Sequence, residues 1–120
     1  MAKLGHIAWW QWIALPGRNW RIVTRVEAGD EVPDRLPRRG VALIGPAESP
    51  TWVAFDCPCA RGHRLMVNLD AARHPAWRIT KTKPLSIRPS VDDITQERRC
   101  HFIMDKGRVK WAHGGQETRR

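Results

Sequence analysis

The chain of 120 residues contains no tyrosine, only two phenylalanines and only three cysteines. An odd number of cysteines, with no basic and apolar signal segment, argues against a secreted disulfide framework. Unpaired thiols are typical of a reducing compartment. No apolar run approaches the roughly 20 residues that a helix needs to cross a bilayer. We therefore predict a cytoplasmic protein that does not act at a membrane.

The sequence also lacks the patterns of several functional classes. It has no His-Glu-x-x-His segment and no His-x-Glu deaminase signature, which argues against two familiar kinds of zinc hydrolase. Its 12 acidic residues are outnumbered by 21 lysines and arginines, and the net charge of +9 favours an acidic partner. Because no basic helix or helix-turn-helix pattern accompanies this charge, nucleic acid is an alternative partner that the sequence does not favour.

The composition fits one small domain. With a mass of 13.8 kDa and 42% hydrophobic residues, the chain can bury one core but hardly two. We expect residues 1–50 to form a Trp-rich β segment on the same core as residues 51–112, and residues 113–120 to be a flexible basic tail. Several of the seven tryptophans should form that core. The cluster of Trp9, Trp10 and Trp12 is interpreted as packing against it.

Helical periodicity is scarce and β-branched runs are frequent, so the predicted fold is mainly β. Strands are expected over residues 19–27, 41–44, 51–55, 64–69, 76–80, 85–88, 101–104 and 108–111. Residues 57–63 should form the tip of one β-hairpin, and residues 105–107 should form the glycine-containing turn of a second, C-terminal hairpin. Residues 89–93 are predicted to be a turn.

Every cysteine lies in one of two short segments that also contain histidine. Cys57 and Cys59 flank a proline and precede His63, and Cys100 is followed by His101. Thiolate and imidazole ligands suit Zn²⁺ better than Mg²⁺ or Ca²⁺, which prefer oxygen. The sequence therefore predicts that the first hairpin carries zinc. Three buried thiols that simply pack as small apolar side chains are the alternative.

Unusual motifs follow one another over roughly residues 51–112. They comprise Phe55, Cys57, Pro58, Cys59, Gly62 and His63, then Asn68, Leu69, Pro75 and Trp77, then Leu85, Ser86, Pro89, Ser90 and Val91, and finally Cys100, His101, Phe102, Gly107, Val109 and Trp111. In order and spacing these residues resemble the bacterial family known as domain of unknown function 6527. The chain differs from that family at Arg61 and Arg98, where members more commonly have cysteine, and at Cys100, where they have serine.

The resemblance implies a metal-binding protein of bacterial operons for ubiquitin-like conjugation. Its expected partners are a ubiquitin-like protein or its conjugates, together with the activating and conjugating enzymes of the same operon. Such a protein is expected to process or remove the modifier, in a pathway of antiphage defence. If the metal is kept, Cys100 has to replace a lost thiolate, and His63 or His101 has to complete the four ligands.

The spacing favours His63 as the ligand. His63 follows the Cys-x-Cys turn closely enough to reach the same ion as Cys57 and Cys59. His101 follows Cys100 on an expected strand, where successive side chains point to opposite faces. If Cys100 faces the metal, His101 faces away from it.

The chemistry expected of the site follows from its ligands. Three thiolates make a bound zinc a poor Lewis acid, so a zinc held by Cys57, Cys59, His63 and Cys100 is predicted to be structural. Catalysis then requires neighbouring groups, and the candidate pair is Ser90 as nucleophile and His101 as general base.

An acidic residue, Asp92 or Asp56, can orient the imidazole. The competing interpretation of Ser90 is a turn-capping hydroxyl. Together with the operon association that the resemblance implies, these residues lead us to predict a zinc-binding peptidase or isopeptidase-like accessory protein that acts on a ubiquitin-like modifier.

Two other functions compete with this prediction. In the first, only Cys57, Cys59 and one histidine hold the zinc, which activates a water molecule whose proton passes to Asp56. In the second, the protein is a zinc-stabilised adaptor without enzymatic activity, and its basic, Trp-rich surface binds an acidic protein or nucleic acid.

Overall fold

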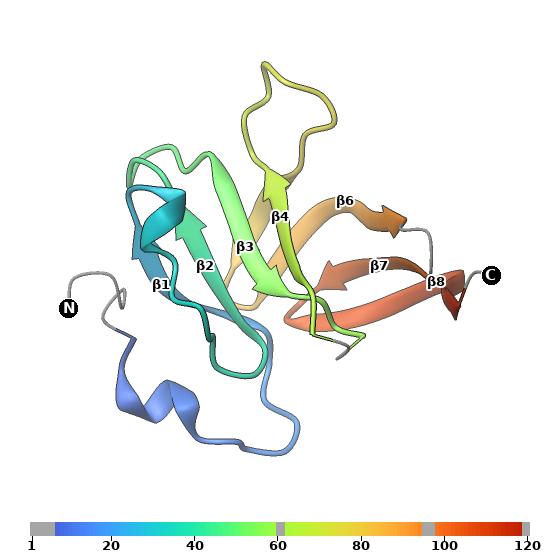
Figure 1. Ribbon diagram of the computed structural model, residues 1–120, viewed down its shortest axis with the longest axis horizontal. Coiled ribbons are helices and arrows are strands. Elements are labelled where there is room, and N and C mark those ends of the chain that lie inside the picture. Colours follow the sequence, from blue (N-terminus) through green and yellow to red (C-terminus); the bar gives the residue numbers. More distant parts are fainter. Residues whose placement is uncertain (1–6, 60–61, 95–97, 119–120) are drawn as a thin grey trace.

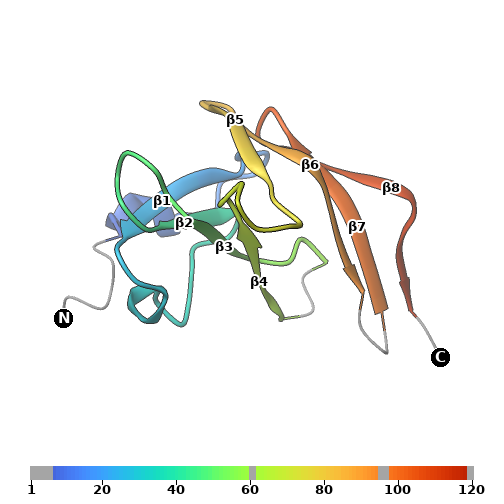
Figure 2. The ribbon, with the colours of Figure 1, turned by 90° about the horizontal axis from the view of Figure 1, so that it is seen from above.

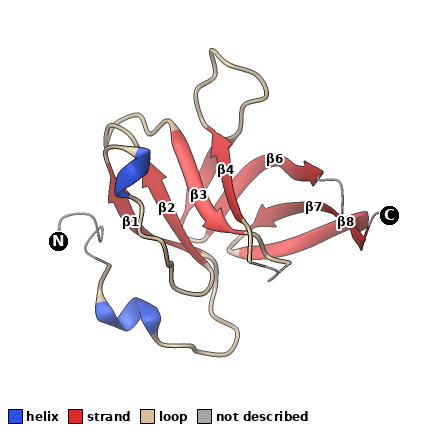
Figure 3. Ribbon diagram, viewed as in Figure 1, coloured by secondary structure: helices blue, strands red, loops and turns tan. Residues whose placement is uncertain are grey.

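The computed structural model describes residues 7–59, 62–94 and 98–118, and for residues 98 and 113–118 it describes the backbone alone. Within these ranges the regular structure consists of eight strands and two short 3-10 helices (Figure 1, Figure 3). The predicted mainly β fold is therefore confirmed. The strands form two four-stranded sheets, one of β1 to β4 and one of β5 to β8. Figure 2 shows the sheets as two separate groups of strands.

The first sheet comprises β1 (Arg21–Val26), β2 (Gly40–Ile44), β3 (Trp52–Asp56) and β4 (Arg64–Asn68), in that order. The pair β1 and β2 is parallel, and the other pairs are antiparallel. Every residue of β2 is buried, as expected for an apolar strand covered on both faces. The antiparallel pairing of β3 with β4 confirms the first predicted hairpin.

The second sheet comprises β5 (Arg78–Thr82), β6 (Leu85–Ile94), β7 (Arg98–Asp105) and β8 (Arg108–Thr118), all antiparallel. The turn between β7 and β8 confirms the second predicted hairpin. Lys106 and Gly107 both have positive φ, at 53° and 77°, as in the two-residue turns that match strand twist. A side chain at Gly107 would also lie 2.7 Å from Asn19, so glycine is required there.

One hydrophobic cluster joins the two sheets. It contains Trp20 and Phe55 from the first half of the chain and Phe102 from β7. Their rings make edge-on contacts, with centroids 5.8 Å apart between Trp20 and Phe55 and 6.3 Å apart between Phe55 and Phe102. Phe102 in turn contacts Trp111, at 5.5 Å. This core fixes β7, and with it the residues of the candidate site, against the hairpin of β3 and β4.

The prediction that the N-terminal tryptophans pack on the core was wrong. Trp9, Trp10 and Trp12 are 75%, 50% and 44% exposed on the first 3-10 helix (Trp9–Trp12). The buried residue of this helix is Gln11, whose side-chain oxygen accepts hydrogen bonds from Arg21 at 2.6 Å and Arg18 at 3.1 Å. Because a four-residue turn can bury only one face, burying Gln11 turns the indoles outward.

Two further predictions about local structure were wrong. Residues 89–93 are not a turn, because β6 continues to Ile94. The register of β6 with β7 is irregular between Ile87 and Val91, and such a bulge tolerates Pro89, which has no N–H to donate. Residues 113–118 are not a flexible tail, because their backbone extends β8 and pairs with the first residues of β7. Residues 119 and 120 lie outside the described residues.

Candidate active site and metal centre

Three cysteines and one histidine meet where the first hairpin reaches the second sheet. Cys57, Cys59 and His63 belong to the connection between β3 and β4, and Cys100 belongs to β7. One ligand atom from each residue can be chosen so that all four atoms lie within 4.8 Å of one another. The thiols are buried, with exposures of 4%, 9% and 1% for Cys57, Cys59 and Cys100. The four residues predicted to bind the metal are thus brought together.

His63 directs one ring nitrogen at the thiols. Its Nε2 atom lies 3.0 Å from Cys59 Sγ and 4.0 Å from Cys100 Sγ. The backbone N–H of Cys57 donates a hydrogen bond to the carbonyl of His63, at 2.9 Å, which closes the connection into a loop. The backbone therefore holds the imidazole close to the cysteines that precede it.

These donors fit a metal ion. Burial raises the pKa of the Cys57 and Cys100 thiols, and neighbouring thiols raise that of Cys57 further. Without a metal the thiols of Cys57 and Cys100 are therefore protonated. In a tetrahedral zinc site with Zn–S bonds of about 2.3 Å, ligand atoms are roughly 3.5 to 3.8 Å apart. Shifts of about 1 Å or less bring this set to that geometry, and its soft donors are those that zinc prefers.

The outer nitrogen of His63 faces a carboxylate that the sequence analysis did not predict. Asp93 Oδ2 lies 3.4 Å from His63 Nδ1. This oxygen is buried and has no hydrogen-bond partner among the described residues. Asp93 is also the cross-strand partner of Cys100. The alternation of side chains along a strand places Asp93 on the same face as Val91, but this signal is visible only if residues 89–94 are predicted to be a strand.

Ser90 and His101 form a second pair, on the other side of the same two strands. Ser90 Oγ lies 3.0 Å from His101 Nε2. Ser90 is part of the irregular segment of β6, where a bulge redirects side chains relative to a regular ladder. The indole N–H of Trp77 donates to the Ser90 carbonyl at 3.1 Å, which fixes the backbone there. Trp77 was not predicted to contribute to the site.

The burial pattern of β7 separates the two clusters. Cys100 and Phe102 are buried, whereas His101 between them is only partly buried. This alternation is the one expected of a strand with one face on the core. His101 therefore lies beside the thiol cluster in sequence but points to the opposite face of the sheet, as the sequence analysis predicted.

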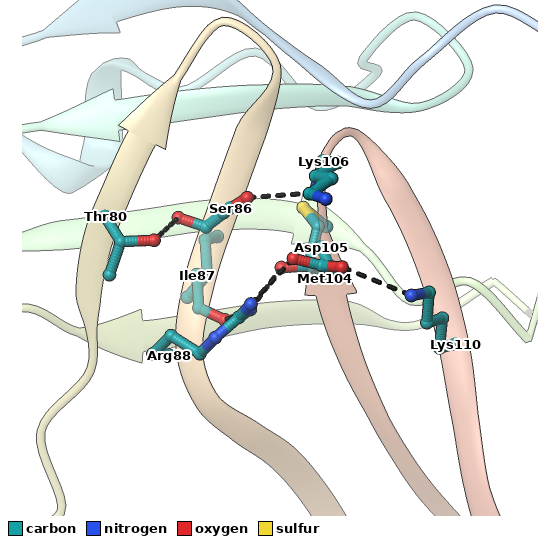
Figure 4. A network of polar contacts seen from close by, with 8 residues as sticks. All are labelled: Thr80, Ser86, Ile87, Arg88, Met104, Asp105, Lys106 and Lys110. Atoms are coloured by element: carbon teal, nitrogen blue, oxygen red, sulfur yellow. Dashed lines mark hydrogen bonds and ion pairs between the residues drawn. The ribbon is translucent and has the colours of Figure 1, made fainter.

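The other two serines are in different surroundings. Ser86 is buried, and its hydroxyl accepts a hydrogen bond from the backbone N–H of Lys106 at 2.8 Å (Figure 4). In the same region Arg88 binds Asp105 at 2.6 Å, and Lys110 binds Asp105 at 3.2 Å (Figure 4). These contacts join β6, β7 and β8 at the end that carries the Lys106 turn. Ser49 is exposed in the connection between β2 and β3.

The two acidic residues considered as partners of the imidazole are bound to arginines. Asp92 is the cross-strand partner of His101, but its two oxygens accept hydrogen bonds from Arg99, each at 3.0 Å. The hydrogen bond from Arg99 lowers the pKa of the Asp92 carboxyl, and the charge of His101 contributes a smaller lowering. Asp56 is bound by Arg64, at 2.8 Å, in the strand pair next to the loop of the hairpin. Neither carboxylate is hydrogen-bonded to His101 within the described structure.

A serine hydroxyl in contact with an imidazole is the arrangement of hydrolases that use a serine nucleophile. The chain belongs to the family described as the bacterial ubiquitination-like system serine protease, BubE, whose model matches residues 28–112. The match includes Ser90, His101 and the thiol cluster, and leaves out the exposed tryptophans of the first 3-10 helix. The match supports the predicted association with bacterial ubiquitin-like systems. It does so through the BubE family, and it does not specifically support the resemblance to domain of unknown function 6527. No curated protein and no solved structure shows a significant match to the chain.

Among the described residues, no helix has the length and apolar character needed to span a membrane.

Proposed function

We propose that this protein hydrolyses the bond that follows the C-terminus of a ubiquitin-like modifier, with Ser90 as the nucleophile and His101 as the general base. The single observation that carries the proposal is the 3.0 Å contact between Ser90 Oγ and His101 Nε2. The family description supports it, because a serine protease needs a serine beside a base. Ser86 and Ser49 have no such neighbour in the described structure.

The proposed reaction follows the general course of serine hydrolysis. Ser90 Oγ attacks the carbonyl carbon of the modifier's C-terminal residue, and its proton passes to His101 Nε2. The tetrahedral intermediate then collapses to an ester of Ser90, and the same proton is transferred to the departing amine. Water attacks the ester in a second round and gives a proton to His101. His101 then returns that proton to Ser90 Oγ as the ester bond breaks, and the free carboxylate of the modifier leaves.

Asp92 is proposed to stabilise the positive charge that His101 acquires during the reaction. It is paired with His101 across the strands, and Arg99 keeps its carboxyl ionised by lowering its pKa. A nearby negative charge stabilises the imidazolium that forms when Ser90 loses its proton. Because Asp92 is bound to Arg99, we expect this contribution to be smaller than that of a carboxylate hydrogen-bonded directly to the ring.

We further propose that Cys57, Cys59, His63 and Cys100 hold a structural zinc ion. When bound, it would join the hairpin of β3 and β4 to β7 and so stabilise the strand that carries His101. The closed set of four donors favours this role over a catalytic zinc with an open position. The ion pair of Asp56 with Arg64 also makes Asp56 a poor candidate for accepting a proton from a bound water.

A second candidate function is the binding of an acidic protein without catalysis. It is favoured by a hollow of about 430 Å³ whose lining includes Arg38, Arg39, Arg108, Trp20 and Trp111. Guanidinium groups beside indole rings are frequent in protein interfaces, and the net charge of +9 favours an acidic partner. In the catalytic proposal the same hollow serves to bind the modifier or an enzyme of its conjugation pathway.

We propose the cytoplasm as the location of the protein, because three thiols that bind zinc suit a reducing compartment.

Cleavage of a precursor separates these two functions. The purified protein is incubated with a ubiquitin-like protein that carries a C-terminal extension, and the products are analysed by mass spectrometry. Wild type is expected to release the extension, Ser90→Ala to be inactive, and the matched control Ser49→Ala to be fully active. Binding of the precursor with no cleavage by wild type would favour the adaptor. Cleavage by Ser90→Ala at the wild-type rate would contradict the proposed nucleophile.

A further inference from the structure

Asp93 is an unusual residue on β6. Its Oδ2 atom is buried and accepts no hydrogen bond in the described structure, although the side chain as a whole is 27% exposed. A buried carboxylate oxygen without a partner destabilises the folded protein. Such an arrangement needs a reason, and the group that Oδ2 faces is the imidazole of His63.

The distance between these groups is slightly too long for a hydrogen bond. Oδ2 lies 3.4 Å from His63 Nδ1, whereas a bond between a charged oxygen and an N–H is usually about 2.7 to 2.9 Å long. The opposite ring nitrogen, Nε2, points at the thiols, at 3.0 Å from Cys59 Sγ. If Nε2 binds a metal, the neutral ring must carry its proton on Nδ1. That proton then lies between the ring and Asp93.

We propose that Asp93 is a positioning residue for the metal centre, accepting a hydrogen bond from His63 Nδ1 and holding Nε2 toward the ion. The inference rests on the proposed binding of metal by the thiol cluster. Carboxylates commonly orient metal-bound histidines in this way, and the bond makes the imidazole a stronger ligand. Asp93 is well placed for this because it pairs across the strands with Cys100, another member of the set.

The proposal predicts opposite effects in the metal-free and metal-bound protein. Without metal, Asp93→Ala removes a buried oxygen that has no partner, so the resistance to denaturant should be unchanged or higher. With zinc, the same substitution should weaken binding about 10- to 100-fold. Asp93→Asn keeps the size of the side chain and one acceptor oxygen, so its affinity for zinc should lie between those of wild type and Asp93→Ala.

The experiment measures the zinc affinity of the full chain by competition with a chromophoric chelator, and denaturant unfolding with and without zinc. Asp92→Ala is the matched control, because Asp92 is the adjacent carboxylate on β6 and binds Arg99 instead of His63. Its zinc affinity should equal that of wild type. His63→Ala should bind zinc only weakly, and Asp93→Ala should not lower this residual affinity further, because Asp93 acts through His63.

Three results would overturn the inference while leaving the metal centre in place. Wild-type affinity in Asp93→Ala would remove the role, and equal destabilisation of the metal-free and zinc-loaded forms would assign Asp93 a merely structural role. Additive losses in the double variant would show that Asp93 does not act through His63. A wild-type chain that takes up no zinc would instead refute the metal centre itself, and the inference with it.

Discussion

Alanine substitutions at His63 and His101 should affect different properties of the protein. The two imidazoles belong to different clusters, because Nε2 of His63 faces the thiols and Nε2 of His101 contacts Ser90. His101→Ala should retain its zinc and lose its activity. His63→Ala should lose its zinc and, as a result, much of its stability.

The magnitudes follow from the contacts that each substitution removes. His101 is partly buried, and its loss removes one side-chain hydrogen bond, which is worth about 0.5 to 1.5 kcal/mol. Loss of a general base lowers the rate of cleavage by about 10² to 10⁴-fold. His63→Ala removes one of four ligands. If free zinc is present at about a thousand times its dissociation constant, losing the metal lowers the free energy of unfolding by about 4 kcal/mol.

Three measurements on each purified variant test this separation: zinc content by elemental analysis, unfolding in denaturant, and cleavage of the extended ubiquitin-like precursor. A His101→Ala variant without zinc would place both histidines on the metal and remove the proposed base. A His63→Ala variant with a full zinc content and wild-type stability would refute the ligand set. Loss of activity in His63→Ala does not test the assignment, because loss of zinc and loss of a catalytic imidazole would both abolish cleavage.

Three further substitutions test the account. Cys57→Ser should abolish stoichiometric zinc binding and lower the free energy of unfolding by several kcal/mol, or prevent soluble expression, which elemental analysis and denaturation would detect. Phe102→Ala should cost about 3 to 5 kcal/mol in a denaturant titration, because Phe102 is fully buried between the two sheets. Asp92→Asn should cost about 0.2 to 1 kcal/mol near neutral pH, because the ion pair with Arg99 is partly exposed. Since Arg99 lowers the pKa of Asp92 in the folded protein, that contribution is complete above the ordinary pKa of the carboxyl. It is lost as the pH falls through the lowered one, so wild type and Asp92→Asn should be equally stable in strong acid.

Much of the fold could be predicted because the responsible signals are local. The alternating pattern of residues 64–69 and the glycine turn at residues 105–107 fix two hairpins without knowledge of the rest of the chain. The four metal-binding candidates could be predicted as well, because cysteine and histidine occur together in only two segments.

The errors arose where tertiary structure overrides local preference. Pro89 predicts a turn, but the bulge in β6 provides a position where its missing N–H is tolerated. Because that strand was missed, Asp93 could not be placed beside the thiols. The N-terminal tryptophans suggested a buried segment, but two arginines bind Gln11 in the interior instead. These polar contacts leave no hydrophobic pattern to detect, although the residues that they join are only 7 and 10 positions apart.

Covalent labelling tests the central claim most directly. A fluorophosphonate forms a bond to the oxygen of an activated serine and releases fluoride, and peptide mapping by mass spectrometry then identifies the labelled residue. We predict a single adduct on Ser90 in the wild-type protein, and none in His101→Ala, where Ser90 has lost its base. An adduct on Ser49 or Ser86, or a protein that cleaves the precursor while Ser90 stays unlabelled, would contradict the proposed active site.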